Sequence, residues 1–194
     1  MKNPNLDFIS KIIRERRAIF PSQFNGNPIN KKTLQLLLEN ANWAPTHKRT
    51  EPWRFHVITG SGLDRLGKYL AEKYREDPKG GVFSEMKYKK TKAKATQSSA
   101  VIAIVMHLDP KASIPEWEEI AATSMAVQNL WLSCAAAGIG TYWSSPSLFT
   151  KNNTFLNLEQ NEKCLGLMYL GYYDDMELTG KRKPIEDKVT WIDQ

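Results

Sequence analysis

The sequence is poor in the residues that bind metals or form disulfides. Its 194 residues include two cysteines and three histidines. Cys134 and Cys164 lie in separate apolar stretches with no Cys-x-x-Cys spacing, which argues against a disulfide framework and a zinc site. The histidines, at positions 47, 56 and 107, are too scattered to bind a metal by themselves. We therefore expect buried structural cysteines, no metal, and a reducing, cytoplasmic environment.

Several common catalytic and targeting motifs are also missing. Gly138 and Gly140 follow a helical pattern and no third glycine follows them, so they do not form a dinucleotide-binding Rossmann turn. The sequence lacks the GxxxxGK[ST] loop of nucleotide triphosphatases and the GxSxG turn of serine hydrolases. The charged N-terminus, MKNPNLDFISKIIRERR, has no apolar signal-peptide core. Residues 120–150 carry no charge, but polar side chains interrupt them, so we expect a helix buried in protein rather than a membrane span.

The composition is that of a globular domain. Apolar residues make up 41% and charged residues 25%, which excludes disordered and collagen-like classes. A chain of this length buries enough surface to fold as one domain, which we place at residues 1–194. The net charge of +6 favours anionic ligands without requiring nucleic acid.

Hydrophobic periodicity predicts alternating helices and strands. Helices are expected from about residue 5 to the pair at 16–17, from Asn30 to before Pro45, near 62–75 with Ser61 and Asp64 as a capping box, and at 116–137. Strands are expected at 53–58, at 101–108 as a central strand, at 164–172, and in IGTYWS as a short strand or turn. This order predicts an α+β fold or an α/β sandwich.

Two segments stand apart from this pattern. Residues 76–98 contain Pro78, two glycines and six lysines, five of them within 87–94, and we interpret this irregular region as a candidate mobile lid. Its lysines are typical of a solvated face, although they also leave nucleic-acid binding open as an alternative. The tail VTWI, at 189–192, is apolar with little chain left to cover it, so we expect it to dock on another subunit.

Positive charge recurs at three separated places. These are the pair Arg16 and Arg17, the segment APTHKRTEPW at 44–53, and GKRKP at 180–184. Guanidinium groups bind phosphate oxygens in pairs and stay charged at any working pH, so the three places could meet around one phosphate. Taken alone, Arg16 and Arg17 are more simply explained as an exposed helix end, and residues 181–183 as a solvated loop.

The same segments, in the same order, carry a family resemblance. Arg16, Arg17 and Ala18 are similar to an Arg-x-Ser element, and residues 44–53 are similar to APxxxNxQPW. PEWEE, GIGTYWSS, LGLMYLGYY and GKRKP then match later blocks. Together they resemble the nitroreductase family of flavin enzymes in its short, single-domain form. The chain departs from the family at Ala18 for Ser, Arg49 for Asn, Glu51 for Gln and Ser144 for Arg.

The resemblance implies a fold, a cofactor and its contacts. It implies an α+β fold with a central, mostly antiparallel sheet flanked by helices, in an intertwined homodimer with residues 184–194 as a C-terminal arm. FMN would lie at the dimer interface. The implied cofactor contacts are Arg16, Arg17, Ala18, His47, Arg49, Trp143, Ser144, Ser145, Lys181 and Arg182.

The resemblance also implies a reaction. FMN would carry a hydride from NAD(P)H to a nitroaromatic, a quinone or a similar acceptor by ping-pong kinetics, with no side chain obligatory for the chemistry. Arg17 or Arg49 would stabilise the negative charge that develops at flavin N1 and O2. Two alternatives remain: an FMN-binding sensor or store without turnover, and a basic nucleic-acid-binding protein. The acceptor and the choice between NADH and NADPH stay open.

Overall fold

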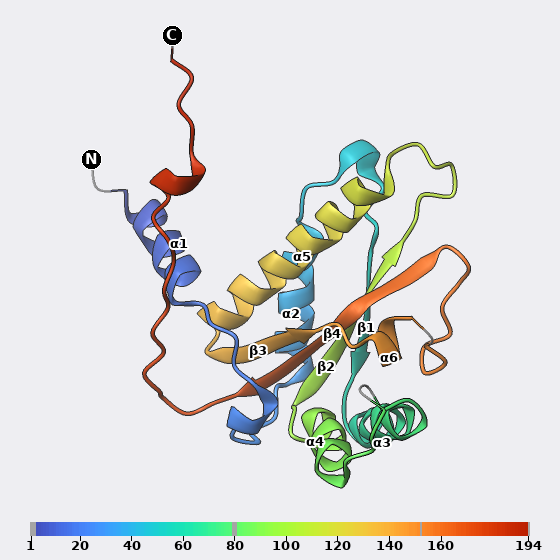
Figure 1. Cartoon of the computed structure of the whole chain (residues 1–194). Helices are drawn as coiled ribbons and strands as arrows, with labels where there is room; N and C mark the ends of the chain where they lie inside the picture. Colours follow the sequence, from blue (N-terminus) through green and yellow to red (C-terminus); the bar gives the residue numbers. More distant parts are fainter. Residues whose placement is uncertain (1–2, 79–80, 152, 194) are drawn as a thin grey trace.

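The molecule is built on one antiparallel sheet (Figure 1). The computed structural model describes residues 3–78, 81–151 and 153–193. Its strands are β1 (Trp53–Ile58), β2 (Ala100–His107), β3 (Ile139–Ser144) and β4 (Glu162–Tyr172), in the order β1-β2-β4-β3. Each neighbouring pair is antiparallel, which confirms the predicted α+β sheet and makes the α/β alternative wrong.

Helices cover both faces of this sheet. On one face, α2 (Lys31–Asn42) and α5 (Glu116–Ala136) bury Leu37 and Leu130 against Ile102 of β2. On the other face, α3 (Ser61–Glu76) and α6 (Ser147–Thr150) bury Leu66 and Phe149 against the opposite side of the strands. Successive residues of β2 alternate between the two cores, and all but the last are buried. The predicted central strand is therefore confirmed.

One face of the long helix α5 is buried, whereas Ile120 and Met125 are exposed at 39% and 40%, so the predicted burial holds for that face alone. Ala126, Leu130 and Cys134 have no exposed surface. The helix ends before Gly138, whose φ of +66° allows the chain to turn directly into β3. Within the described parts of the chain, no helix is both long and apolar enough to cross a bilayer.

The two predicted helix caps have different outcomes. Asn30 caps α2, because its side-chain oxygen accepts a hydrogen bond of 2.8 Å from the Thr33 N–H. The predicted capping box at Ser61 and Asp64 is wrong, because α3 already begins at Ser61 and Gly60 is the cap. Gly60, at φ +53°, turns the chain sharply between β1 and α3.

The irregular structure expected over residues 76–98 is wrong for most of that region. Residues Glu85–Thr96 form α4, which packs against α3. The two helices approach so closely that a Cβ atom on Gly67 would lie 2.7 Å from the Lys92 carbonyl oxygen. The lysines hide this helix from a periodicity analysis, because Ala95 is its one buried residue among those described. Residues 79 and 80 lie outside the described parts, and lid motion stays a prediction.

The two ends of the chain lie beside each other, away from the sheet (Figure 1). Helix α1 (Pro4–Glu15) begins at Asn3, whose side chain accepts from two backbone N–H groups, and none of its residues is buried. Short 3-10 helices occur at η1 (Pro21–Gln23), η2 (His47–Arg49) and η3 (Glu186–Lys188). Residues 184–193 are exposed throughout, including Trp191 at 84%. Docking of this arm on a second subunit stays a prediction.

Candidate functional site

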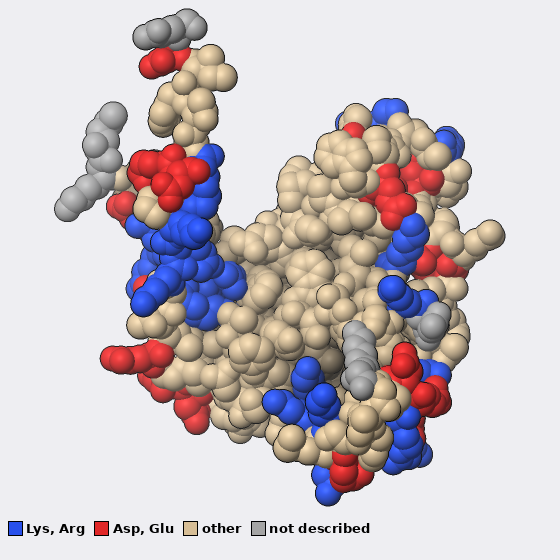
Figure 2. All heavy atoms as spheres, viewed as in Figure 1, with Lys and Arg blue, Asp and Glu red and all other residues tan. Residues whose placement is uncertain are grey.

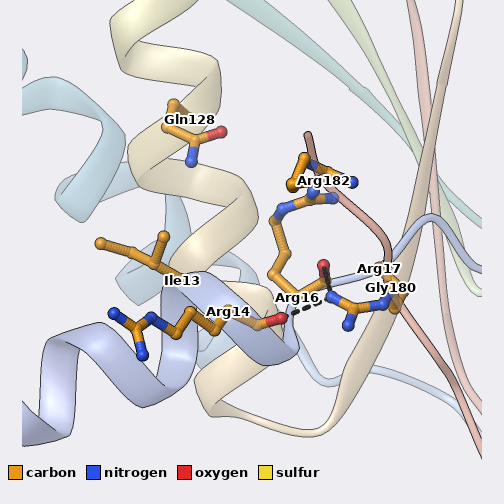
Figure 3. A pocket seen from close by; sticks show the side chains of 7 residues that line it. All are labelled: Ile13, Arg14, Arg16, Arg17, Gln128, Gly180 and Arg182. Atoms are coloured by element: carbon orange, nitrogen blue, oxygen red, sulfur yellow. Dashed lines mark hydrogen bonds between the residues drawn. The ribbon is translucent and has the colours of Figure 1, made fainter. Parts of the chain in front are cut away.

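A cavity of about 550 Å³ lies where α1 ends, beside α5 and the segment after β4 (Figure 3). Arginine side chains from two of these segments meet in it, and we call it the arginine pocket. Its lining residues are Ile13, Arg14, Arg16, Arg17, Gln128, Gly180 and Arg182. The pocket thus joins two of the three basic places in the sequence, which are separated by more than half of the chain.

The edge of the sheet holds this pocket in place. Ala18 forms a parallel bridge with Thr141 of β3, and the Ile19 N–H donates to the Thr141 carbonyl oxygen at 3.0 Å. Gly140 makes the close approach possible, because a Cβ atom there would lie 2.8 Å from Ile19 Cβ. Arg16 and Arg17 are therefore fixed between the end of α1 and strand β3.

The guanidinium groups are held in defined positions. Arg17 Nη1 donates to the carbonyl oxygens of Arg14 at 2.5 Å and Arg16 at 2.9 Å (Figure 3). Gly180 packs directly on this group, since a Cβ atom at Gly180 would lie 2.2 Å from Arg17 Nη2. Arg16 lies over the ring of Trp131, with 4.6 Å between Cζ and the ring centre.

Among the described residues, no carboxylate pairs with the positive charge of the arginine pocket. Burial lowers the pKa of Arg16, and the nearby cations Arg182 and Arg17 lower it further. Within the described residues, none of these three arginines pairs with a carboxylate, and Arg17 Nε is buried without a hydrogen-bond partner. Figure 2 shows the blue surface gathered at this end of the molecule. Such a pocket fits a phosphate group, whose oxygens would accept from the unpaired donors.

A second cavity, of about 300 Å³, lies at the N-terminal end of α5, and we call it the histidine cavity. It is lined by residues including Pro45, Thr46, His47, Trp117, Glu118 and Met125. His47 Nδ1 lies 2.5 Å from Glu118 Oε2. Glu118 could not be identified from the sequence, because nothing in the PEWEE segment shows which of its acids meets His47.

The arginine pocket and the histidine cavity are separate within one chain. Glu118 and Gln128 belong to the same helix, ten residues apart, which corresponds to roughly 15 Å along its axis. The structure therefore brings Arg16, Arg17 and Arg182 together and leaves His47 at the other centre. Arg49 and Lys181 are exposed, and neither lines the arginine pocket.

The three predicted contacts at the end of β3 occupy different environments. The Trp143 ring packs against the core under α5, and its Nε1 is buried without a hydrogen-bond partner. Gly166 of β4, at φ +146°, leaves room for this ring, since a Cβ atom there would lie 2.6 Å from Trp143 Nε1. Ser144 is half-buried and Ser145 is exposed.

Within the described residues, the cysteines and the possible metal ligands do not form a site. Burial raises the pKa of Cys134 to about 12 and that of Cys164 to about 11, so both thiols stay protonated. This agrees with the predicted structural role. In the part of the chain that the structure describes, no group of three or more His, Cys, Asp or Glu side chains could hold a metal ion.

Comparison with known proteins places the chain in a family. The model of the Nitroreductase family matches residues 13–172. The Bacillus subtilis (strain 168) protein named "Putative NAD(P)H nitroreductase YfhC" is 30% identical over 183 residues, which cover 92% of this chain and 91% of that protein.

Solved structures agree with this family. The nitroreductase-like family protein from Bacillus cereus has a TM-score of 0.78 and 29% identity, with 95% of each chain covered. The FMN-dependent nitroreductase NfnB from Mycobacterium smegmatis, solved in complex with NADPH, has a TM-score of 0.76 at 19% identity, with 96% of this chain and 99% of that chain covered, and shows the same fold. As the resemblance predicted, the chain belongs to the nitroreductase family.

Proposed function

We propose that this chain is an FMN-dependent oxidoreductase that takes a hydride from NAD(P)H and passes it to a nitroaromatic, a quinone or a similar small acceptor. The family supports an oxidoreductase role, and the B. subtilis relative carries the name "Putative NAD(P)H nitroreductase YfhC". The M. smegmatis structure, which has the same fold, is described as FMN-dependent and contains NADPH.

The arginine pocket is the observation that carries this proposal. FMN has a phosphate at one end and a conjugated ring system at the other. Arg16, Arg17 and Arg182 would hold the phosphate, since their donors lack carboxylate partners among the described residues. The backbone at Ala18 is bridged to Thr141, and β3 runs from there to Ser144, roughly 10 Å further. A ring system extending along β3 would reach Trp143, Ser144 and Ser145.

When bound, FMN supplies a two-electron carrier that accepts a hydride at N5. The protein's part is to bind and orient it. Arg49, the other predicted candidate, would favour the negative charge that develops at flavin N1 and O2, since Arg17 is fixed by two carbonyl oxygens at the phosphate end. Because NAD(P)H and the acceptor would use the same face of the ring in turn, we expect ping-pong kinetics.

The proposed active form is a homodimer. Apolar side chains of α1 and the arm are exposed, with Leu6 at 61%, Phe8 at 65% and Ile192 at 90%. A second copy would cover these side chains and remove their apolar surface from water, which is favourable. It would also allow the histidine cavity of one chain to face a cofactor held by the other, which would explain why Arg49 and Lys181 lie outside the arginine pocket.

The test is a visible spectrum followed by steady-state kinetics. The protein is mixed with FMN, freed of unbound FMN, and scanned for flavin absorbance. NADH and NADPH oxidation is then measured with nitrobenzene and with benzoquinone. Bound flavin with parallel double-reciprocal lines is the expected result. Bound flavin without turnover would favour the sensor or store, and a protein that binds no FMN would overturn the proposal.

A further inference from the structure

The first turn of α5 carries three acids, and two of them have structural partners. Glu116 forms an ion pair with Lys163, at 2.7 Å between Oε1 and Nζ. Glu119 is buried and accepts a hydrogen bond of 2.9 Å from the Asp109 N–H. The third acid, Glu118, faces His47 and lines the histidine cavity instead. The fold therefore accounts for Glu116 and Glu119 but gives Glu118 no comparable task.

The loop that carries His47 is braced against movement. Lys48 Nζ donates to the Ser113 carbonyl oxygen at 2.7 Å, and the Glu51 N–H donates to Thr46 Oγ1 at 3.2 Å. Lys48, Arg49 and Glu51 all have φ between +42° and +57°, which costs free energy for residues other than glycine. A strained loop held by several bonds keeps the imidazole in one place.

The Glu118 carboxylate determines which imidazole nitrogen of His47 carries hydrogen. An ionised carboxylate only accepts hydrogen bonds, so the nitrogen that faces Glu118 carries the hydrogen. His47 Nε2 lies across the ring from this bond, and the His47 side chain is 57% exposed. When both nitrogens carry hydrogen, Glu118 balances the charge and Nε2–H is available to an oxygen atom of a ligand.

The walls of the cavity suit a flat ring. The Trp117 side chain is exposed at 66% and Met125 at 40%, and both line the space beside the imidazole. Aromatic and thioether side chains pack well against planar conjugated rings. The volume of about 300 Å³ is at the small end of ligand sites, which favours a ligand of one or two rings.

We propose that Glu118 is a positioning residue: it holds Nδ1–H of His47 and so presents Nε2 to an oxygen on a planar conjugated ring bound in the histidine cavity. The inference rests on the proposed function for its ligand, which is either the aromatic acceptor or the oxygen-bearing ring of the flavin. Both share the same chemistry, a flat ring with a carbonyl or nitro oxygen. No bond is made or broken by Glu118 itself.

The test compares substitutions at two acids of the same helical turn. Glu118→Met removes the acceptor at similar size, Glu118→Gln keeps a neutral acceptor, and Glu116→Met is the matched control outside the cavity. The dissociation constants of nitrobenzene and of FMN are measured separately by tryptophan and flavin fluorescence. Long-range ¹H–¹⁵N spectra report which imidazole nitrogens carry hydrogen, and the sequence has three histidines to assign.

We expect Nδ1 of His47 to be protonated in the unaltered protein and to lose this preference in Glu118→Met. One dissociation constant should rise about tenfold in Glu118→Met and less in Glu118→Gln, and stay within about twofold in Glu116→Met. A rise for nitrobenzene places the acceptor in the cavity, and a rise for FMN places the flavin ring there; both support the positioning role.

Two results would overturn the inference. One is an unprotonated Nδ1 on His47 in the unaltered protein, and the other is unchanged binding of both ligands in Glu118→Met. A protein that fails to bind FMN or oxidise NADPH would refute the proposed function instead. The imidazole spectra and nitrobenzene binding would still decide the role of Glu118 in that case.

Discussion

Charged side chains are paired at the N-terminal end of α5 but unpaired beside its C-terminal half. At the N-terminal end, each acid of the first turn has a partner: Lys163 for Glu116, His47 for Glu118 and the Asp109 N–H for Glu119. In the C-terminal half of the helix, Gln128 lies in a pocket lined by four arginines, one of which covers Trp131, and none of these arginines pairs with a carboxylate among the described residues.

The difference separates charges that are paired within the fold from charges prepared for a ligand. Acids near the start of a helix face the positive end of its dipole, which favours them, although burial disfavours the ionised form of Glu119 and raises its pKa. Like charges held close together raise the free energy of the folded protein, and at Arg16 burial first and then the neighbouring Arg182 and Arg17 lower the pKa. An arrangement of that kind is stabilised when an anion enters it.

The largest effect is expected when arginines are removed from the arginine pocket. The double variant Arg16→Ala with Arg182→Ala removes two of the four arginines that line the pocket. Each charge-assisted hydrogen bond contributes about 1.5 to 3 kcal/mol, so we expect FMN affinity to fall by at least about a hundredfold. The melting temperature without FMN should stay the same or rise, because repulsion is relieved. Flavin absorbance after desalting measures the first effect, and calorimetry the second.

A second double variant, with the same loss of charge away from the pocket, is the control. Arg65 and Lys68 are exposed on α3, on the other face of the sheet, so Arg65→Ala with Lys68→Ala should leave FMN binding unchanged. Flavin retained by the arginine-pocket variant would show that the phosphate is bound elsewhere.

A milder change moves one guanidinium without removing it. A Cβ atom on Gly180 would collide with the end of the Arg17 side chain, which is flexible enough to move aside. Gly180→Ala should therefore lower FMN affinity by about tenfold, since Arg17 leaves its position, while changing the melting temperature little. The neighbouring Thr179→Ala, at an exposed residue outside the pocket lining, should bind FMN as the unaltered protein does. Equal affinity in the two variants would contradict the role of Arg17.

Much of the fold could be predicted from the sequence because its signals are local. The β-branched run around Ile102 and Ile104 defines a strand buried on both faces, and Gly138 marks the end of α5. Helix α4 was missed because its lysines mask the pattern and the helix depends on close packing between Gly67 and Lys92. Periodicity does not show contacts of that kind.

The site could be predicted only in part, for the same reason. Basic residues at both ends of the chain suggested a phosphate site, and Arg16, Arg17 and Arg182 do converge. The choice of Glu118 as the partner of His47 depends on how η2 folds back over α5, and residues with positive φ make that fold. Exposed residues such as Arg49 have surroundings that one chain alone does not define.

A smaller effect is expected at Glu119, at the N-terminal end of α5, in the pH dependence of the free energy of unfolding. Burial raises the pKa of the Glu119 carboxyl above its ordinary value near 4.5. Between that value and the raised pKa, the folded state therefore holds a proton that the unfolded state has lost. The free energy of unfolding therefore falls as pH rises from about 4.5 through the raised pKa. Glu119→Gln keeps an acceptor for the Asp109 N–H and should lose this dependence, gaining about 1 kcal/mol at pH 7. Urea unfolding across pH 4 to 8 measures it, and equal slopes in both proteins would be the contrary result.

The smallest effect is expected at Glu116, whose partner lies at the surface. Glu116 and Lys163 are each about half exposed, so water and salt screen their ion pair. Glu116→Gln should lower the free energy of unfolding by about 0.5 kcal/mol or less, and the difference should vanish in 1 M salt. A loss several times larger, or one that persists in salt, would mean that this end of α5 depends on its charge pairs as strongly as the arginine pocket is expected to depend on an anion.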